Sequence, residues 1–185
     1  LTACRSGIAT MKDILEKASR IKLLIFDVDG VLTDGSLFLG DDGQEYKAFN
    51  SQDGHGIKML QKHGVRCAII TGRTSKVVEH RMRNLGIDFD LIYQGQHNKL
   101  EGFANLLAKV DLEPEQVAYV GDDVVDLPVM RKVGLAIAVN NAHPWVIRHA
   151  HWQTPRGGGQ GAARDVCEML LEAHGALQTE LESYL

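Results

Sequence analysis

The stretch Leu23-Leu-Ile-Phe-Asp-Val-Asp-Gly-Val-Leu-Thr-Asp-Gly35 decides the fold of this chain. Its apolar run, Leu23–Phe26, is too short for a helix and is typical of a buried strand in a parallel sheet. Two acids, Asp27 and Asp29, follow this run directly, and Gly30 lets the chain turn away at once. Open α/β folds bind their ligands at the carboxyl edge of the sheet. The stretch therefore predicts two carboxylates in one crevice at that edge.

A calcium-binding loop and a surface turn are the structural alternatives for such closely spaced acids. A calcium loop needs further oxygen ligands at alternate positions and a distal Glu, but Val31 and Thr33 occupy those places. A single Asp at a strand end is usually a turn or cap residue. A simple turn would not need two acids beside a wholly apolar strand, so we interpret the stretch as a chemical site.

Composition and charge narrow the class of protein. The 185 residues suffice for one domain with a full core, and the net charge of −4 gives no electrostatic case for nucleic acid or an anionic membrane. No apolar run approaches the roughly 20 residues of a membrane span, and the start does not look like a signal peptide. Three scattered cysteines, without a C-x-x-C pair, fit reduced thiols in a cytosol. We expect a cytoplasmic protein.

Beyond the first strand, short apolar runs alternate with amphipathic stretches, and Ser75 can cap the second of the expected helices. Strands are predicted at Val65–Ile70, Leu91–Tyr93, Val117–Val120 and Leu135–Val139, and helices at Asp53–His63, after Ser75, at Lys99–Val110, up to Met130 and near Trp145. This alternation predicts an α/β fold with a doubly wound, Rossmann-like parallel sheet, in one domain covering residues 1–185. A loose arm and a short helix are expected before the first strand.

Two segments lie outside this alternation. Short runs on both sides of an Asp- and Gly-rich turn predict a β-hairpin at about residues 36–49. Leu37 and Leu39 alternate in it, so one face needs a cover. The C-terminal tail, about 155–185, begins with the glycine-rich segment Arg156–Gly161. That segment is either a flexible linker or a mobile loop whose amides meet an anion.

Acidic residues recur at a second strand end. Asp122 and Asp123 follow an apolar run, and Asp126 lies on the same helix face as Asp122. Carboxylates that converge with Asp27 and Asp29 would repel one another without a counter-charge. A hard cation such as Mg²⁺, which binds one or two carboxylates together with a substrate phosphate, resolves this repulsion. For Asp123 and Asp126, capping of the helix is an equal alternative.

Phosphoryl transfer also needs a cation on the phosphate oxygens, and Lys99 stands at the required edge of the sheet. It follows the third predicted strand and begins a helix. Thr71, at the end of the second predicted strand, offers a hydroxyl and nearby amides. Both positions fit phosphate binding.

These motifs resemble, in order, the four motifs of the haloacid dehalogenase superfamily, which consists mostly of phosphatases with an aspartyl-phosphate intermediate. The resemblance implies that Asp27 is the nucleophile and Asp29 the general acid/base. Thr71 matches the second motif, Lys99 the third, and Gly121-Asp122-Asp123 with Asp126 the fourth. It further implies Mg²⁺ held by Asp27, Asp122 and the backbone carbonyl of Asp29. Only the small hairpin stands where other members insert a cap domain, so we expect a capless fold.

Residues 12–175 closely resemble a narrower family, the phosphatases of 3-deoxy-D-manno-octulosonate 8-phosphate. The resemblance rests on Asp27–Thr33, Lys47-Ala-Phe-Asn50, Asp53-Gly54, Thr71-Gly-Arg73, Tyr93-Gln-Gly-Gln96, Asn98-Lys99, Gly121-Asp-Asp123 and the glycine-rich tail. It implies hydrolysis of an acid-sugar phosphate in lipopolysaccharide biosynthesis. It also implies a homotetramer in which the hairpins meet centrally and the C-terminal tail, with its glycine loop, enters a neighbouring subunit's site.

The same resemblance implies the residues that contact the substrate: Asp29, Asn50, Ser51, Gln52, Asp53, Gly54, Lys58, Arg73, Arg81 and Lys99. Two departures stand out, Ser51-Gln52 where the family pattern has Val-Arg and Lys58 where it has Arg. A nine-carbon, sialic-acid-type sugar 9-phosphate is therefore an alternative substrate. A non-catalytic assembly module is the alternative from another class, and the four intact motifs argue against it.

Overall fold

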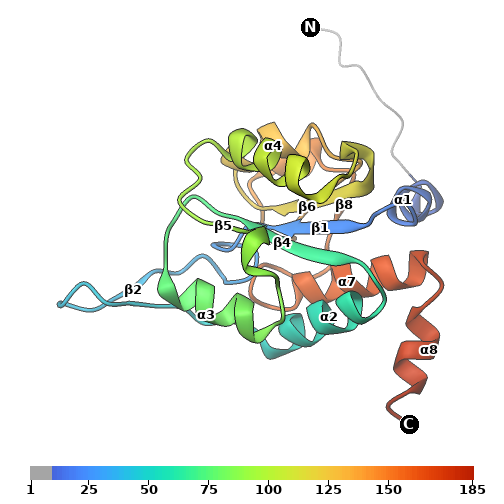
Figure 1. Ribbon diagram of the computed structural model, residues 1–185, viewed down its shortest axis with the longest axis horizontal. Helices are drawn as coiled ribbons and strands as arrows, with labels where there is room; N and C mark the ends of the chain where they lie inside the picture. The colour runs from blue at the N-terminus through green and yellow to red at the C-terminus, as the bar shows by residue number, and fades with distance from the viewer. Residues whose placement is uncertain (1–9) are drawn as a thin grey trace, which may run out of the picture.

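A computed structural model describes residues 10–185, and the expected N-terminal arm lies mostly outside them. Six parallel strands form one sheet in the order β5-β4-β1-β6-β7-β8 (Figure 1). Their bounds are β1 Leu23–Phe26, β4 Arg66–Ile70, β5 Ile92–Tyr93, β6 Val117–Gly121, β7 Leu135–Ala138 and β8 Trp152–Gln153. The predicted parallel sheet is confirmed, with β8 as an additional edge strand.

Helices cover both faces of the sheet. Helices α4, α5 and α6 lie on one face, and α2, α3 and α7 lie on the other (Figure 1). The helices are α1 Met11–Ala18, α2 Ser51–Lys62, α3 Lys76–Asn84, α4 Lys99–Val110, α5 Leu127–Met130, α6 Pro144–His149, α7 Ala162–Ala173 and α8 Leu177–Glu182, with short 3-10 turns at Phe89–Leu91, Pro114–Gln116 and Val124–Asp126. The doubly wound arrangement is thus confirmed. None of the described helices combines the length and apolarity that a membrane crossing requires.

The register of the central strands places the acids together. Phe26, the last residue of β1, pairs with Ile69 on β4 and with Val120 on β6. The residues that follow these three emerge at the same sheet edge, so Asp27 and Asp122 become neighbours although they are far apart in sequence. All four side chains of β1 are 0% exposed. Burying each of them contributes roughly 1.5–3 kcal/mol, which fixes the strand that carries Asp27.

Local chemistry differs from the prediction at the starts of two helices. Helix α2 begins at Ser51 rather than Asp53, because the Oδ1 of Asn50 accepts hydrogen bonds from the backbone N–H groups of Gln52 and Asp53. Ser75 occupies the N-cap position of α3, as predicted, but its side chain makes no capping hydrogen bond. Its backbone N–H instead donates to the side chain of Gln94, at 2.8 Å.

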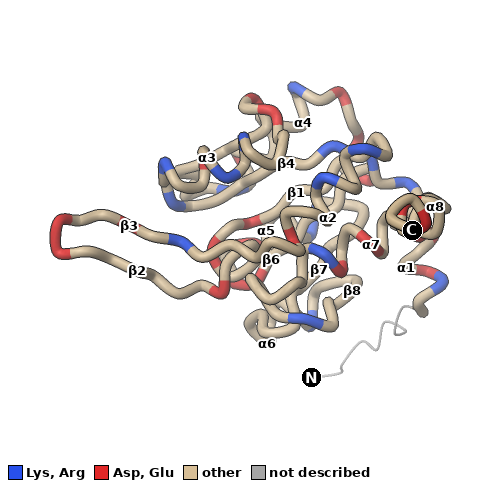
Figure 2. Tube along the Cα trace, turned by 90° about the horizontal axis from the view of Figure 1, so that it is seen from below, with Lys and Arg blue, Asp and Glu red and all other residues tan. Residues whose placement is uncertain are grey.

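The predicted hairpin is confirmed, with strands β2 Phe38–Leu39 and β3 Glu45–Tyr46 (Figure 1). It projects away from the sheet and the helices (Figure 2). Leu37, Phe38, Leu39 and Tyr46 are each at least 50% exposed. Both faces of the hairpin therefore present apolar side chains to solvent.

The glycine-rich segment is a docked loop rather than a flexible linker. The backbone N–H of Gly159 donates to the carbonyl of Val31, and that of Gly158 donates to the side chain of Asn141. A Cβ on Gly158 would lie 1.7 Å from the carbonyl oxygen of Gly30, so only glycine permits this approach. The loop thus packs against the turn that follows β1 of its own chain.

Candidate active site

Asp27 lies at the end of β1 and is only 6% exposed. Its Oδ1 accepts a hydrogen bond from the Val28 backbone at 2.7 Å, and its Oδ2 lies 2.9 Å from the Nζ of Lys99. Burial and the nearby Asp126 raise the pKa of Asp27 to about 6, against the opposing effect of Lys99. The two contacts therefore fix the position of the Asp27 carboxylate, while burial and Asp126 disfavour its ionised form.

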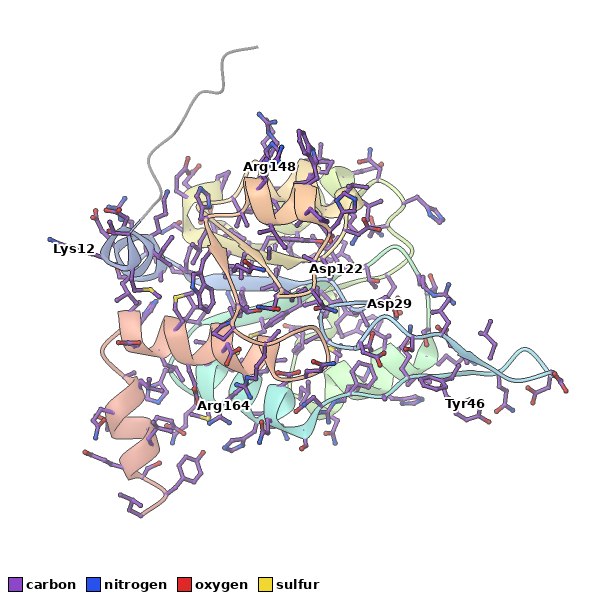
Figure 3. The ribbon with its side chains drawn as sticks, turned by 180° about the vertical axis from the view of Figure 1, so that it is seen from behind. Lys12, Asp29, Tyr46, Asp122, Arg148 and Arg164 are labelled. Atoms are coloured by element: carbon purple, nitrogen blue, oxygen red, sulfur yellow. The ribbon has the colours of Figure 1, made fainter. Side chains whose placement is uncertain are left out.

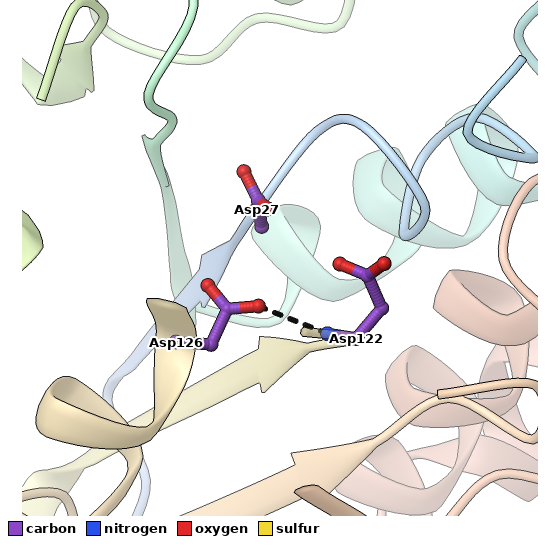
Figure 4. A group of neighbouring side chains, drawn as sticks. All are labelled: Asp27, Asp122 and Asp126. Atoms are coloured by element: carbon purple, nitrogen blue, oxygen red, sulfur yellow. Dashed lines mark hydrogen bonds between the residues drawn. The ribbon is translucent and has the colours of Figure 1, made fainter. Parts of the chain in front are cut away.

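Asp122 presents a second carboxylate to the same point. One oxygen from each of Asp27, Asp122 and Asp126 lies within 4.8 Å of the others (Figure 4). Burial, followed by repulsion from Asp126 and Asp27, raises the pKa of Asp122 to about 7. A Cβ on Gly30 would lie 2.1 Å from an Asp122 carboxylate oxygen, and Gly30 also has a φ of +89°. A glycine is required there on both grounds.

Asp126 organises the site rather than offering an open ligand. It is 0% exposed, and its Oδ1 accepts hydrogen bonds from Lys99 at 2.6 Å and from the Tyr119 hydroxyl at 2.7 Å. Its Oδ2 accepts the backbone N–H group of Asp122 at 3.0 Å (Figure 4) and that of Asp123 at 3.2 Å. Four donors thus occupy this carboxylate, which ties together the ends of β6 and α4.

Asp123 takes the capping alternative. Its side chain is exposed, and its Oδ1 accepts a hydrogen bond from the Val124 backbone at 2.7 Å. Together with Asp126 it forms a reciprocal capping box around the turn Val124–Asp126. This capping role accounts for the position of the Asp123 side chain without a contact to a metal.

Lys99 is the first residue of α4, and it is 5% exposed. Burial opposes its charge, but Asp126 and Asp27 outweigh burial and raise the pKa of Lys99. The ammonium group therefore remains charged between two carboxylates. The cation predicted at this sheet edge is in contact with the predicted nucleophile.

The donor set fits Mg²⁺. Asp27 and Asp122 offer carboxylate oxygens, and within residues 10–185 the carboxylate of Asp122 accepts no hydrogen bond from the protein. Burial raises the pKa values of both groups first, and repulsion among the carboxylates raises them further than Lys99 offsets. A hard cation with oxygen ligands relieves this repulsion.

Asp29 points away from these carboxylates toward the hairpin. Its Oδ1 pairs with Lys47, and its Oδ2 lies 3.9 Å from the Nε of Arg73. Arg73 and Lys47 both also pair with Glu45, at 3.1 and 2.9 Å. Sequence reasoning assigned no role to Lys47 or Glu45, although their i, i+2 spacing on a predicted strand places both side chains on one face.

Thr71 lies where it was predicted. It follows β4, it is 2% exposed, and its backbone N–H donates to the carbonyl of Tyr93 at 2.9 Å. The carbonyl of Thr71 in turn accepts the backbone N–H of Gln96. These bonds hold the residue at the same sheet edge as Asp27.

The predicted substrate segment at Asn50–Gly54 makes contacts with the C-terminal part of the chain. The Nδ2 of Asn50 donates to the carbonyl of Gly159, and Gln52 accepts from Arg156. Asp53 is 2% exposed and accepts the backbone N–H of Arg164 at 2.8 Å, and burial raises its pKa. This Asp53 contact joins α2 to α7.

Ser51, Lys58 and Arg81 lie together in a different place. They line a groove of about 200 Å³ between α2 and α3, in which Gly54 leaves room for the Arg81 guanidinium. Arg81 also donates to the carbonyl of Asn50, at 3.4 Å. Within residues 10–185, no hydrogen bond or ion pair of the structure links Lys58 or Arg81 to Asp27, Asp122 or Lys99.

The comparisons with known proteins show the family of the chain. Residues 89–164 match the haloacid dehalogenase-like hydrolase family. The chain is 53% identical over 177 residues to the 3-deoxy-D-manno-octulosonate 8-phosphate phosphatase KdsC of Escherichia coli K12, covering 96% of this chain and 92% of the relative. No cap domain interrupts the described residues, in line with the capless expectation.

Solved structures give the same result. The phosphatase of that name from Yersinia pestis has a TM-score of 0.87 at 48% identity and covers 90% of this chain and 89% of its own. The Moraxella catarrhalis enzyme, solved with a magnesium ion, a phosphate ion and a KDO molecule, has a TM-score of 0.92 at 39% identity, covering 95% and 100%. Together with the arrangement of Asp27, Lys99 and Asp122, these similarities show that the chain belongs to the 3-deoxy-D-manno-octulosonate 8-phosphate phosphatase family of haloacid dehalogenase-like hydrolases.

Proposed function

We propose that this chain is a Mg²⁺-dependent phosphoric monoester hydrolase that converts 3-deoxy-D-manno-octulosonate 8-phosphate to the free sugar acid and phosphate, in lipopolysaccharide biosynthesis. The observation that carries the proposal is the contact of Lys99 with Asp27 beside the open carboxylate of Asp122. A nucleophile, a phosphate-binding cation and a metal ligand thus lie at one sheet edge.

The reaction uses two carboxylates in separate surroundings. Asp27 attacks phosphorus, the bond to the sugar oxygen breaks, and Asp29 gives a proton to that oxygen. Asp29 then removes a proton from water, whose oxygen attacks the phosphorus of the aspartyl phosphate and releases phosphate and the Asp27 carboxylate. Mg²⁺ held by Asp27, Asp122 and the carbonyl of Asp29 supplies charge neutralisation between nucleophile and phosphate.

Other residues bind the substrate. Lys99 and Thr71 neutralise and hydrogen-bond the phosphate oxygens, since both lie at the edge that carries Asp27. Arg73, about half exposed beside Asp29, suits the sugar carboxylate. Asn50, Asp53, Gly54 and Arg81 are assigned to the sugar side of the site by their match to the family pattern. Ser51, Gln52 and Lys58 are assigned to it by their positions in that pattern, from which their side chains depart.

The hairpin supports a homotetrameric assembly. An isolated two-stranded hairpin is marginally stable in water, and this one exposes Leu37, Phe38, Leu39 and Tyr46. A homotetramer with hairpins meeting centrally would cover them. In it the C-terminal tail would reach a neighbouring subunit from the glycine loop, which itself packs on its own chain. The cytoplasm suits Cys67 and Cys167, which are buried free thiols.

Phosphate release from three substrates tests the proposal: the eight-carbon sugar 8-phosphate, a nine-carbon acid-sugar 9-phosphate and an aryl phosphate. EDTA-sensitive release with a preference for the first is expected. A preference for the nine-carbon sugar would instead assign the alternative substrate. The departures from the family pattern at Ser51, Gln52 and Lys58 favour that alternative. No release from any substrate would favour a non-catalytic module.

A further inference from the structure

The hairpin turns two charged side chains toward the active site, those of Glu45 in β3 and of Lys47 directly after β3. Successive side chains of a strand point to opposite faces, so Glu45 and Lys47 share one face and Tyr46 lies on the other. The Lys47 side chain is 1% exposed, whereas Tyr46 is 60% exposed. Figure 3 shows Tyr46 on the projecting hairpin and Asp29 near its base. The hairpin is thus attached to the site by a buried cation.

Lys47 and Glu45 form a network of ion pairs with Asp29 and Arg73, in which cations and carboxylates alternate. The ammonium of Lys47 contacts the carboxylate of Asp29 and lies 2.9 Å from that of Glu45. Arg73 lies 3.1 Å from Glu45 and 3.9 Å from Asp29. The side chains of Asp29 and Glu45 are 21% and 16% exposed, so water screens these contacts incompletely.

This attachment is unusual because the hairpin adds nothing else to the interior. None of the buried core residues comes from residues 36–48, and Phe49 is the first apolar residue after them that packs against the core. The position of β3 and the direction of the Asp29 carboxylate therefore share one buried contact, that of Lys47, beside the half-exposed Arg73. Without Lys47, the Asp29 carboxylate would keep the longer contact with the half-exposed Arg73, at 3.9 Å, and would lose its buried partner.

We propose that Lys47 is a positioning residue for Asp29: it holds this carboxylate toward the leaving group, and through it the hairpin controls the protonation of the departing oxygen. The inference rests on the proposed function, in which Asp29 is the general acid. It adds a residue that does not touch the reacting atoms, and it makes catalysis depend on the placement of a segment that lies outside the core.

The test is the dependence of kcat/KM on the leaving group. Aryl phosphates whose phenols differ in acidity are compared for the wild type, Lys47→Gln and Lys47→Arg with Mg²⁺ present. Weakly acidic phenols need protonation as they depart, and general acid catalysis contributes roughly 10²–10⁴-fold. We expect Lys47→Gln to lose about tenfold or more with the least acidic phenol and much less with the most acidic one, and Lys47→Arg to restore most of the loss.

The slope of log kcat/KM against the acidity of the phenol does not depend on how much of the enzyme is folded, because misfolding lowers the rates for all phenols equally. Lys12→Gln, an exposed lysine at the far end of the molecule from Asp29 (Figure 3), is the matched control and should keep the wild-type slope. A parallel loss for all phenols, or no change, would overturn the role of Lys47. A wild type that hydrolyses none of these esters would instead contradict the proposed function.

Discussion

Lys99 and Asp126 form a buried ion pair, with the Nζ of Lys99 2.6 Å from the Oδ1 of Asp126. The pair links the start of α4 to the turn after β6, and it leaves the ammonium within 2.9 Å of Asp27. Because Asp126 also accepts two backbone N–H groups and the Tyr119 hydroxyl, the cation is held by a carboxylate with no remaining freedom. The pair therefore joins two segments of the fold and also sets the position of the Lys99 ammonium beside Asp27.

The substitution Asp126→Asn should destabilise the fold strongly. It replaces a buried anion by a neutral amide of similar size, and breaking a buried pair on one side costs about 3–5 kcal/mol. Asp123→Asn, at the exposed cap beside it, should cost about 1 kcal/mol or less. Denaturant unfolding of both variants measures the difference, and equal effects would contradict the role given to Asp126.

The substitution Asp27→Asn should separate activity from stability. Turnover should fall by at least roughly a thousandfold, as for other nucleophile deletions. Without Mg²⁺ at pH 8, the midpoint of thermal unfolding should equal or exceed that of the wild type, since the change removes one of the repelling carboxylates. Full turnover by this variant would refute the nucleophile assignment.

Stability should depend on pH and Mg²⁺ together. Burial and mutual repulsion raise the pKa values of Asp27 and Asp122 to about 6 and about 7, from an ordinary 3.8. The folded state therefore binds protons more tightly than the unfolded state. The stability this contributes is present at low pH and is lost as pH rises through 6 and 7.

Mg²⁺ needs both carboxylates ionised, so its effect should have the opposite dependence on pH. The rise in the thermal midpoint on adding Mg²⁺ should be small near pH 5 and larger near pH 8. At pH 8, Mg²⁺ at a hundredfold excess over its Kd should add about 2.7 kcal/mol to the free energy of unfolding. Asp122→Asn should reduce this rise at pH 8. A rise that does not change with pH would argue against Mg²⁺ at these carboxylates.

The substitution Gly158→Ala should displace the turn that follows β1, although Gly158 itself is not a residue of the active site. Its Cβ would lie 1.7 Å from the Gly30 carbonyl oxygen, which forces the loop and the turn after β1 apart. Activity and thermal stability should both fall. Gly86→Ala is the matched control, because Gly86 has a φ of +78° but no atom within 4 Å of the added Cβ, so it should cost only about 1 kcal/mol of backbone strain. Similar effects of the two variants would mean that the loop yields easily.

Local periodicity was enough to predict the strand and helix order and the acids at the strand ends. Leu23–Phe26 could only be a short buried strand, and a parallel sheet brings the ends of its strands to one edge. Asp27, Lys99 and Asp122 therefore came together as predicted from the sequence. Periodicity carries this information because it depends on neighbours within a few residues.

Tertiary structure alone decided how the charges pair. The sequence does not distinguish Asp126, which holds Lys99 and the backbone of β6, from Asp123, which caps a turn in solvent. Nor does it reveal that Lys47 is buried against Asp29, or that the glycine loop docks on its own chain. Each of these contacts depends on distances between segments remote in sequence. Only the packed sheet and helices fix those distances.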